Sequence, residues 1–527
     1  MNKDKLMLFG CGLLATAAMQ AEEAQKPNII YIMCDDMGYG DLGCYGQKYI
    51  STPNLDRMAS EGMLFTDAYA GSPVSAPSRA SLMTGQHTGH GHVRGNREYW
   101  QKSLRPNAFG TNPDYDVIGQ EPYKNTHKII PELFKEAGYR TGMFGKWAAG
   151  YYNMNPPDTY KTDAEGNTDT QAWQTSSSTS LPNLRGIDCY YGPICQFQAH
   201  TYSPNFLNRY DPERYGDRHV VVDTLKQNIA HRDVSSGHPD YENRAQYSAD
   251  LIHRYALDWI DRQKEDEPFL GIFTYTLPQH YTDKFRADDS PFGGAFGSWY
   301  YRNANRHAQF AAMITRLDKQ VGEIMEKLRK KGFADNTLVI FTSDNGPHTE
   351  GGADPDWFNR DGKLRGVKRS THEGGIRVPF IAVGPGVPAG TVNHHQLAFY
   401  DLMPTLLDYA GLDGDAYSRK ASTEQQRFDG ISFANTLRGK HRRQKKHEFL
   451  YWEFHETNML ALRMGNWKMV VRDGKSSLYN LATDLHEDND VAAENPKIVA
   501  RMKNIIRQEH VTSELFKVTL PDEQERK

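Results

Sequence analysis

Residues 75–85, which read Ser-Ala-Pro-Ser-Arg-Ala-Ser-Leu-Met-Thr-Gly, bring a hydroxyl, a guanidinium and the start of a helix together within five residues. Pro77 suits the first turn of a helix, where its missing N–H is not needed. Ser75 is therefore expected at the start of that helix, beside unpaired backbone N–H groups and Arg79, where an oxyanion can bind. The alternative is a serine that only caps the helix, with a solvated arginine behind it.

Apolar runs of strand length and the helices between them predict the fold. Such runs lie at 28–34, 139–144 and 337–342, and an amphipathic helix is expected over 310–328. Helices that alternate with buried strands predict a large, mostly parallel sheet sandwiched by helices. In open parallel sheets, ligands bind at the carboxyl ends of the strands. We therefore expect the polar side chains that follow these strands to converge.

The side chains after two of these strands are typical ligands of a hard cation. Asp35 and Asp36 follow the first strand, Asp344 and Asn345 follow the last, and Lys146 follows the strand at 139–144. Four direct oxygen ligands favour calcium over magnesium, because magnesium usually keeps several waters. Asp, Asn and Gly also dominate tight turns, so either motif alone would be read as a turn. Their position at two buried strand ends favours one calcium site.

The N-terminus and the overall charge restrict the location and the partners. Lys3 and Lys5 precede an apolar stretch that ends near Ala21, which predicts a signal peptide over residues 1–21 and an exported, periplasmic protein. Lipid anchoring or a surface location through Cys11 is the alternative. No later segment has the length of a membrane span. A net charge of −4 gives no electrostatic case for binding nucleic acid.

Two cysteines and one basic segment allow two readings each. Cys189 and Cys195 could pair across a short loop in an oxidising compartment, or stay free. The segment 440–447 is strongly basic, and we interpret it as a solvated linker between subdomains in preference to a glycan-binding strip.

The run Ser-x-Pro-Ser-Arg followed by Leu-x-Thr-Gly resembles the active-site motif of the type I sulfatases of the alkaline phosphatase superfamily. Further segments resemble that family along most of the chain: residues 35–36, 145–147, 186–188, 343–346, 373–375, 400–405 and 467–468. The resemblance implies an α/β catalytic domain over residues 26–425. It also implies a smaller C-terminal α+β subdomain over residues 426–527, with a short antiparallel sheet.

The resemblance also implies residue roles. Asp35, Asp36, Asp344 and Asn345 become the calcium ligands. Ser75 becomes the precursor of 3-oxoalanine (formylglycine), made by an anaerobic, radical-type maturation enzyme because the precursor is serine and not cysteine. Arg79, Lys146 and Lys368 are assigned to the nucleophile and the sulfate.

Two departures from the family pattern concern the acid that protonates the leaving group. Many relatives carry a histidine after Gly-Lys-Trp, where this chain has Ala148. A second family histidine follows a strand that ends in proline, and here His280 comes one residue late, after Pro278 and Gln279. We expect His280 to be the leaving-group acid, although a histidine on a surface loop would look the same in sequence.

Loop residues near these motifs are candidates for binding the substrate. The residues that we expect to contact it are Arg94, Asn96, His200, His348 and Glu350. Their alternative is simple solvation, and His87, His90 and His92 could also form an adventitious metal patch. Polar and aromatic loops, with a resemblance to sulfatases of gut bacteria, favour an exo-acting carbohydrate sulfatase. Sulfated galactose or N-acetylgalactosamine of host glycans is the first expectation.

Two other functions fit the same motifs. One is a phosphomonoesterase or phosphodiesterase of the same superfamily that uses Ser75 directly. The other is a glycan-binding homologue without catalysis. The single oxygen-only metal set argues against the first, and the presence of both Arg79 and Lys368 argues against the second.

Overall fold

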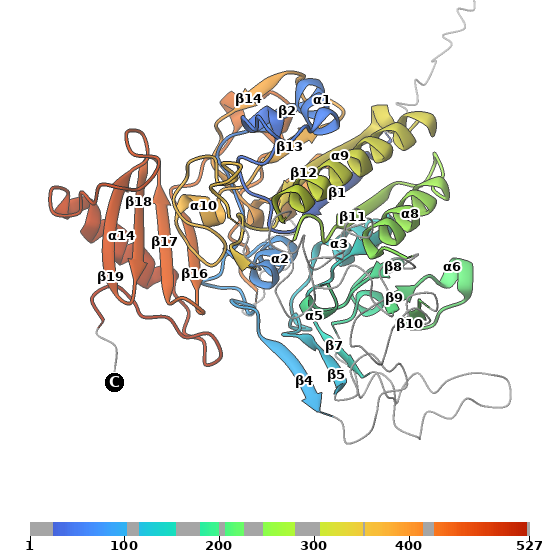
Figure 1. Cartoon of the computed structure of the whole chain (residues 1–527), viewed down its shortest axis with the longest axis horizontal. Helices are drawn as coiled ribbons and strands as arrows, with labels where there is room; N and C mark the ends of the chain where they lie inside the picture. The colour runs from blue at the N-terminus through green and yellow to red at the C-terminus, as the bar shows by residue number, and fades with distance from the viewer. Residues whose placement is uncertain are drawn as a thin grey trace, which may run out of the picture.

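A central sheet of ten strands organises the computed structural model, which describes residues 25–102, 115–153, 180–199, 206–225, 246–279, 306–350, 354–414 and 426–523 (Figure 1). Strand β1 (Asn28–Cys34) lies between β11 (Phe269–Thr274) and β12 (Thr337–Ser343), and both neighbours run parallel to it. β11 pairs in parallel with β6 (Arg140–Gly145). The outer strands are β8 (Cys189–Gly192), β9 (Phe206–Tyr210) and β10 (Val221–Thr224) on one side and β13 (Phe380–Val383), β2 (Met63–Phe65) and β14 (Thr391–Asn393) on the other.

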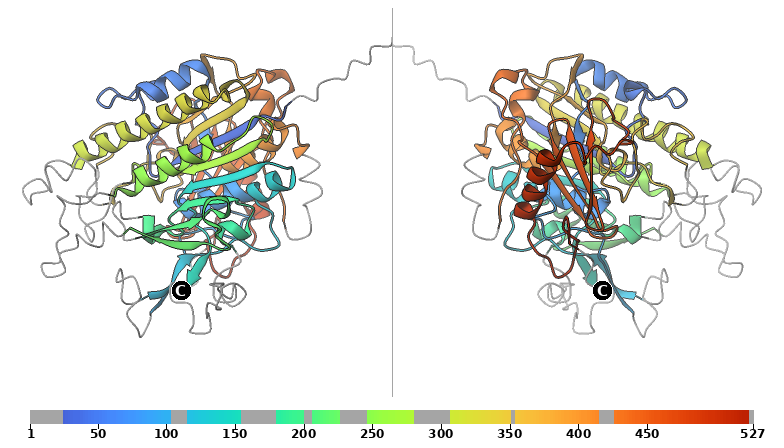
Figure 2. Two further views of the ribbon diagram at one scale, coloured as in Figure 1. Left: turned by 90° about the vertical axis from the view of Figure 1, so that its right-hand side faces the viewer. Right: turned by 90° about the vertical axis from the view of Figure 1, so that its left-hand side faces the viewer.

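Helices cover both faces of this sheet, as the sequence pattern predicts. Alternate residues of β1 point into two separate apolar cores, Ile29 into one and Ile30 into the other. The first core is closed by α2 (Ser75–Thr84), α3 (Ile130–Glu136) and α11 (Leu402–Tyr409). The second is closed by α1 (Pro53–Glu61), α8 (Ser248–Asp261) and α9 (Arg306–Lys330), and Figure 2 shows α8 and α9 running together along that face. The predicted sandwich is confirmed.

A second, antiparallel sheet follows at the C-terminal end of the chain (red in Figure 1). It consists of β16 (Leu450–Phe454), β17 (Met459–Met464), β18 (Trp467–Arg472) and β19 (Lys475–Asn480), paired in chain order. Helix α14 (Pro496–Glu509) packs on one face through Met502 and Ile506. On the other side, Trp452 packs against Tyr69 and Tyr400, which belong to the part of the chain that carries the ten-stranded sheet. The predicted C-terminal subdomain is thus confirmed, while its boundary at residues 425 and 426 stays a prediction.

Short elements connect these parts. β3 (Ala68–Tyr69) pairs with β15 (Leu397–Ala398), and β4 (Glu98–Lys102), β5 (Tyr115–Gln120) and β7 (Tyr151–Asn153) form a three-stranded sheet. The short α-helices are α5 (Gln196–Ala199), α6 (Pro212–Tyr215), α10 (Glu373–Ile376) and α13 (Ala434–Leu437). The 3-10 helices are η1 (Gly43–Tyr45), η2 (Pro182–Leu184), η6 (Ala334–Asn336), η8 (Phe399–Asp401) and η9 (His441–Arg443).

Cys189 and Cys195 are both free. Cys189 lies in the core on the α8 and α9 side of the sheet, and Cys195 lies in the core on the opposite side. A disulfide needs its two Cβ atoms about 4 Å apart, so two cysteines in cores on opposite sides of the sheet do not pair.

The N-terminal segment expected to be a signal peptide ends before the first described residue. Among the described helices, none combines the length and the apolar character that a bilayer crossing needs.

Candidate active site

Ser75 is the first residue of α2 and is fully buried. Val74 is the N-cap residue, in extended conformation, so the serine hydroxyl does not cap the helix. Its Oγ instead donates to Asp35 Oδ1 at 3.3 Å. The helix ends at Gly85, whose φ of 66° lies in the left-handed region that favours glycine. The hydroxyl at the helix start therefore faces the strand ends, as predicted.

The carboxylates at the strand ends form one cluster. β1 and β12 pair in register up to Cys34 and Ser343, so the residues after them emerge side by side. Carboxylate oxygens of Asp35, Asp36 and Asp344 lie within 4.8 Å of one another, and all three side chains are buried. Asp36 has a φ of 62°, and its backbone N–H donates to Asp344 Oδ1 at 3.2 Å. A positive φ in a non-glycine residue is strained, and such strain is typical of functional sites.

Three buried cations contact these carboxylates. Arg79 Nη2 donates to Asp35 Oδ2 at 3.1 Å and to Asp344 Oδ2 at 2.9 Å. Lys146 Nζ donates to Asp35 Oδ2 at 2.7 Å, and Lys368 Nζ donates to Asp36 Oδ2 at 2.8 Å. The structure thus brings together Ser75, the three predicted cations and the predicted carboxylates.

The pKa values of Asp35 and Asp36 are shifted in opposite directions. Burial, helped by the charges of Asp35 and Asp344, raises the pKa of Asp36 to about 6 against the opposing effect of Lys368. Burial would also raise the pKa of Asp35, but the charges of Lys146, Arg79 and Lys368 outweigh it and lower that pKa. Burial lowers the pKa of the Lys146 amine, although Asp35 opposes the shift. Neighbouring carboxylates repel one another when both are ionised, and a bound cation removes that repulsion. This cluster is therefore suited to binding a cation.

The donor set fits a hard divalent cation. Asn345 Nδ2 donates to Asp36 Oδ1 at 2.7 Å, whereas the buried Oδ1 of Asn345 has no hydrogen-bond partner among the described residues. A buried polar atom without a partner is uncommon and calls for a ligand. With the carboxylates of Asp35, Asp36 and Asp344, this oxygen completes the four-oxygen set predicted for calcium.

Three of the predicted substrate-binding residues lie around this cluster. Asn96 Oδ1 accepts the N–H of Ala76, the residue after Ser75, at 3.1 Å. A carboxylate oxygen of Glu350 lies 3.6 Å from Lys368 Nζ. His348 is fully buried, and its Nδ1 accepts the Glu350 N–H at 3.1 Å.

Arg94 is engaged elsewhere. Its side chain is buried and donates to Glu453 Oε2 at 3.1 Å and to the carbonyl oxygens of Gly91 and Val511. This ion pair joins the loop after α2 to the C-terminal sheet. A contact between Arg94 and substrate stays a prediction.

His200 and His280 lie outside the described residues, so their roles also stay predictions. Ala148, which stands where many relatives carry a histidine, is buried, with a φ of 57° and its N–H bonded to the carbonyl of Ile194. Its methyl group supplies no proton donor at this point.

Three further residues at the site, Glu456, Arg369 and Glu98, carry no motif that predicts their role. Glu456, in the turn between β16 and β17, accepts the Asn96 N–H at 2.7 Å and lies 3.5 Å from Arg369 Nε. Arg369 also pairs with Glu350. Burial raises the pKa of Glu98 to about 7, opposed by Lys146 and reinforced by Glu456. The C-terminal subdomain therefore contributes to the rim, through a turn that is hundreds of residues from Ser75 in sequence.

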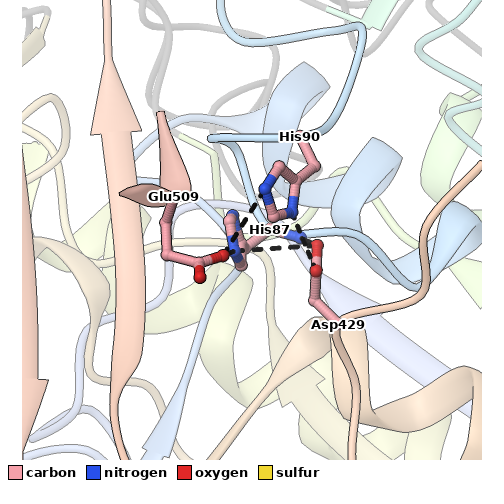
Figure 3. A group of neighbouring side chains, drawn as sticks. All are labelled: His87, His90, Asp429 and Glu509. Carbon is pink, nitrogen blue, oxygen red and sulfur yellow. Dashed lines mark hydrogen bonds and ion pairs between the residues drawn. The ribbon is translucent and has the colours of Figure 1, made fainter. Parts of the chain in front are cut away.

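The histidines after α2 form a cluster of their own (Figure 3). His87 Nε2 lies 3.3 Å from Glu509 Oε2, and His90 Nδ1 lies 2.8 Å from Asp429 Oδ1. Gly89 N–H donates to His87 Nδ1, so the neutral His87 ring carries its proton on Nε2 and presents no lone pair there. This arrangement favours a hydrogen-bonded clamp on α14 over a metal patch. His92 lies apart, with Nε2 2.9 Å from Glu121.

A hydroxyl at a helix start, three buried cations and a four-oxygen cation site, gathered at the carboxyl edge of a mostly parallel sheet, define a hydrolase site for an ester of a tetrahedral oxyanion. The sequence profile of the family described as Sulfatase matches residues 27–412. The chain belongs to the sulfatase family.

Relatives agree with this assignment. The chain is 32% identical over 414 residues to N-acetylgalactosamine-6-sulfatase of Homo sapiens, an alignment that covers 78% of this chain and 66% of the human protein. It thus spans slightly less than two thirds of that relative. It is 28% identical over 530 residues to N-acetylgalactosamine-6-O-sulfatase of Bacteroides thetaiotaomicron, which covers 92% of this chain and 93% of the relative.

Solved structures share the fold. The crystal structure of Ps i-CgsB is 26% identical with a TM-score of 0.64, and the match covers 92% of each chain. The phosphonate monoester hydrolase of Agrobacterium radiobacter, at 19% identity and a TM-score of 0.55 over 92% of this chain and 95% of that one, shares the fold alone.

Proposed function

We propose that this sulfatase is an exported enzyme that removes sulfate from carbohydrates, using a formylglycine made from Ser75 and one bound calcium ion. The observation that carries the proposal is the Ser75 hydroxyl, 3.3 Å from Asp35 and surrounded by buried cations on the four-oxygen cluster. Relatives named for N-acetylgalactosamine 6-sulfate support sulfated galactose or N-acetylgalactosamine as the substrate. The structure of Ps i-CgsB in complex with k-i-k-neocarrahexaose, 28% identical over 92% of each chain with a TM-score of 0.63, also supports a saccharide.

The chain's own residues account for sulfate binding. Lys146 and Lys368 each use one N–H on a carboxylate, and an ammonium group keeps two further donors for the sulfuryl oxygens. Arg79 donates hydrogen bonds to Asp35 and Asp344 and so holds both carboxylates in position. Fixed donors of this kind, aimed at charge that develops in the transition state, usually give the largest catalytic contribution.

Two groups would complete the site. Asp35, Asp36, Asp344 and Asn345 would hold calcium, which neutralises charge on sulfuryl oxygens when it is bound. Formylglycine at Ser75, installed by an anaerobic, radical-type maturation enzyme, would supply the nucleophile. We assign protonation of the departing sugar oxygen to His280, because Ala148 has no proton to give.

Substrate contacts are proposed for the rim. Asn96 and Glu350 are the best placed to accept hydrogen bonds from sugar hydroxyls, since both adjoin the sulfate site. His348, His200 and Arg94 are the remaining candidates. A periplasmic location is proposed from the basic and apolar N-terminal segment, and lipid anchoring or a surface location is the alternative.

Sulfate release from a panel of singly sulfated monosaccharides tests this function. We expect turnover of 6-sulfated N-acetylgalactosamine or galactose, and none with Ser75→Ala, which should keep the fold. A variant within about tenfold of the wild type, the scale of a minor catalytic group, would contradict the mechanism. Faster hydrolysis of the matching phosphate esters would instead favour a phosphatase.

A further inference from the structure

A cavity of about 460 Å³, separate from the site around Ser75, lies where the edge of the large sheet meets the C-terminal subdomain. Three separate parts of the chain enclose it: the segment after the edge strand β14, the segment from α13 to residue 447, and the turn between β17 and β18. Its lining residues are Asn393, His394, His395, Gln396, Thr436, His441, Gln444, Lys446, His447 and Gly465. The cavity shares no residue with the site around Ser75, and its volume lies in the range of ordinary ligand pockets.

The lining is rich in groups that can donate hydrogen bonds. It contains one lysine and four histidines and no carboxylate. The carboxylates beside it are already engaged: His447 Nε2 lies 2.7 Å from Asp401 Oδ1, which also accepts the Ile431 N–H. Asp67, near His394, pairs with Arg377 at 3.2 Å and Arg463 at 2.8 Å. The cavity therefore offers an anion an electropositive environment with no free carboxylate among its lining residues.

His395 is a half-buried hydrogen-bond donor of this cavity. Its ring contacts Phe433, and neither ring nitrogen has a hydrogen-bond partner among the described residues. Burial lowers the pKa of His395 to about 4, and the charges of His447, Lys446 and His441 act in the same direction, while Asp401 opposes them. A half-buried imidazole whose ring nitrogens have no protein partner can donate a hydrogen bond to an anion that enters the cavity.

Neutral groups beside His395 suit sugar hydroxyls. Asn393 Oδ1 accepts a hydrogen bond from the backbone N–H of His395 at 2.9 Å. The Nδ2 of Asn393 has no partner in the described part of the chain. Gln396 Nε2 donates to the carbonyl of Gly465 at 3.1 Å, so its Oε1 is left as an acceptor. Nothing in the lining repeats the nucleophile or the oxygen cluster of the catalytic site, so a ligand here would be held and not hydrolysed.

We propose that this cavity is a non-catalytic site for a sulfated sugar unit of a polymeric substrate. His395 and Lys446 bind the sulfate group, and Asn393 and Gln396 bind sugar hydroxyls. The basic segment 440–447 then serves as part of a glycan-binding surface and not merely as a solvated linker. Holding one sulfated unit here keeps the rest of the same chain near the catalytic site and raises its effective concentration there. The identity of the ligand rests on the proposed carbohydrate sulfatase function.

Binding of a polymer whose repeat carries N-acetylgalactosamine 6-sulfate tests the proposal, with the full-length Ser75→Ala chain to prevent turnover. We expect Lys446→Gln with His395→Gln to weaken binding about tenfold, which is 1.4 kcal/mol. The matched control, Lys475→Gln with His486→Gln, removes one lysine and one histidine from the exposed surface of the C-terminal subdomain and should bind normally. In chains that keep Ser75, the double substitution should leave kcat/KM for a monosulfated monosaccharide unchanged.

Normal binding by the Lys446 and His395 variant would overturn the proposal, as would equal binding of the chemically desulfated polymer. Equally tight binding of sodium sulfate alone would show an ion site with no sugar recognition, which also overturns it. If His395→Gln impairs folding, Lys446→Glu alone carries the test. Failure of the proposed function is distinguishable, because no sugar sulfate would then be hydrolysed, whatever the polymer binds.

Discussion

Replacing Arg79 by lysine tests whether the buried guanidinium organises the catalytic cluster. Arg79 Nη2 bonds to Asp35 at 3.1 Å and to Asp344 at 2.9 Å, and its Nε bonds to Asp344 at 3.2 Å. A lysine keeps the charge but lacks the planar fork that bridges two carboxylates. Because a charge-assisted hydrogen bond contributes about 1.5–3 kcal/mol, loss of one such bond from a preorganised site predicts a fall in kcat/KM of about 10²-fold.

Initial rates on a sulfated monosaccharide measure this fall, and thermal unfolding of the same variant measures its fold. Arg501→Lys is the matched control, since Arg501 is an exposed residue of α14 that pairs with Glu448 on the surface. We expect wild-type kcat/KM from the control. A kcat/KM for Arg79→Lys within about threefold of the wild type would refute the positioning role, because one lost bond is worth more than that.

Three further predictions follow from the electrostatics of buried groups. Removal of calcium with a chelator should abolish turnover and lower the Tm, since a ligand at 100 times its Kd stabilises the fold by about 2.7 kcal/mol; an unchanged Tm would argue against an ion on the carboxylate cluster. Because the pKa of Glu98 is raised to about 7, its carboxyl is neutral below that pH and repels the sulfate above it. The kcat/KM should therefore fall as the pH rises through about 7, and an identical fall in Glu98→Gln would exclude Glu98 as the cause. Lys468→Met removes the ammonium group 2.8 Å from buried Glu373, which keeps Arg377 at 3.2 Å as a partner. Loss of one charge-assisted hydrogen bond should lower the free energy of unfolding in denaturant by about 1.5–3 kcal/mol, and a loss below about 1 kcal/mol would show that the pair contributes no more than an exposed salt bridge.

The pH dependence of stability adds a check on the Lys468 pair. Burial raises the pKa of Glu373, but Lys468, Arg377 and Arg463 outweigh it and lower that pKa to about 2. A carboxylate with a depressed folded-state pKa stabilises the fold above its unfolded value of about 4.5. That contribution should disappear as the pH falls from about 4.5 to about 2.

The elements that position the site could be predicted because their signals are local. The apolar run at 28–34 is the whole of β1, and the run at 337–342 is β12 but for its last residue. β1 and β12 pair in parallel, which brings Asp35 and Asp344 together at the ends of the strands. The sequence does not show that these two strands are neighbours, but a parallel sheet places all of their carboxyl ends at one edge. Pro77 and the residues around it predict that Ser75 lies at the start of a helix, where the structure places it.

Long-range partners could not be predicted in the same way. Arg94 looks like a loop donor in sequence, yet its buried partner Glu453 lies in the C-terminal sheet. Glu456 reaches the rim through a turn whose position depends on how the two sheets pack. Cys189 and Cys195 are close in sequence, but β8 ends at Gly192 and the chain beyond it carries Cys195 into the other core. Spacing along the chain carries no information on such contacts.

The mass of the peptide that contains Ser75, from protein purified out of its native host, tests the central claim most directly. Oxidation of the serine to formylglycine removes two hydrogen atoms from that peptide and from no other. We predict a peptide lighter by two hydrogens in protein that releases sulfate from sugar esters. An unmodified serine in fully active protein would contradict the account.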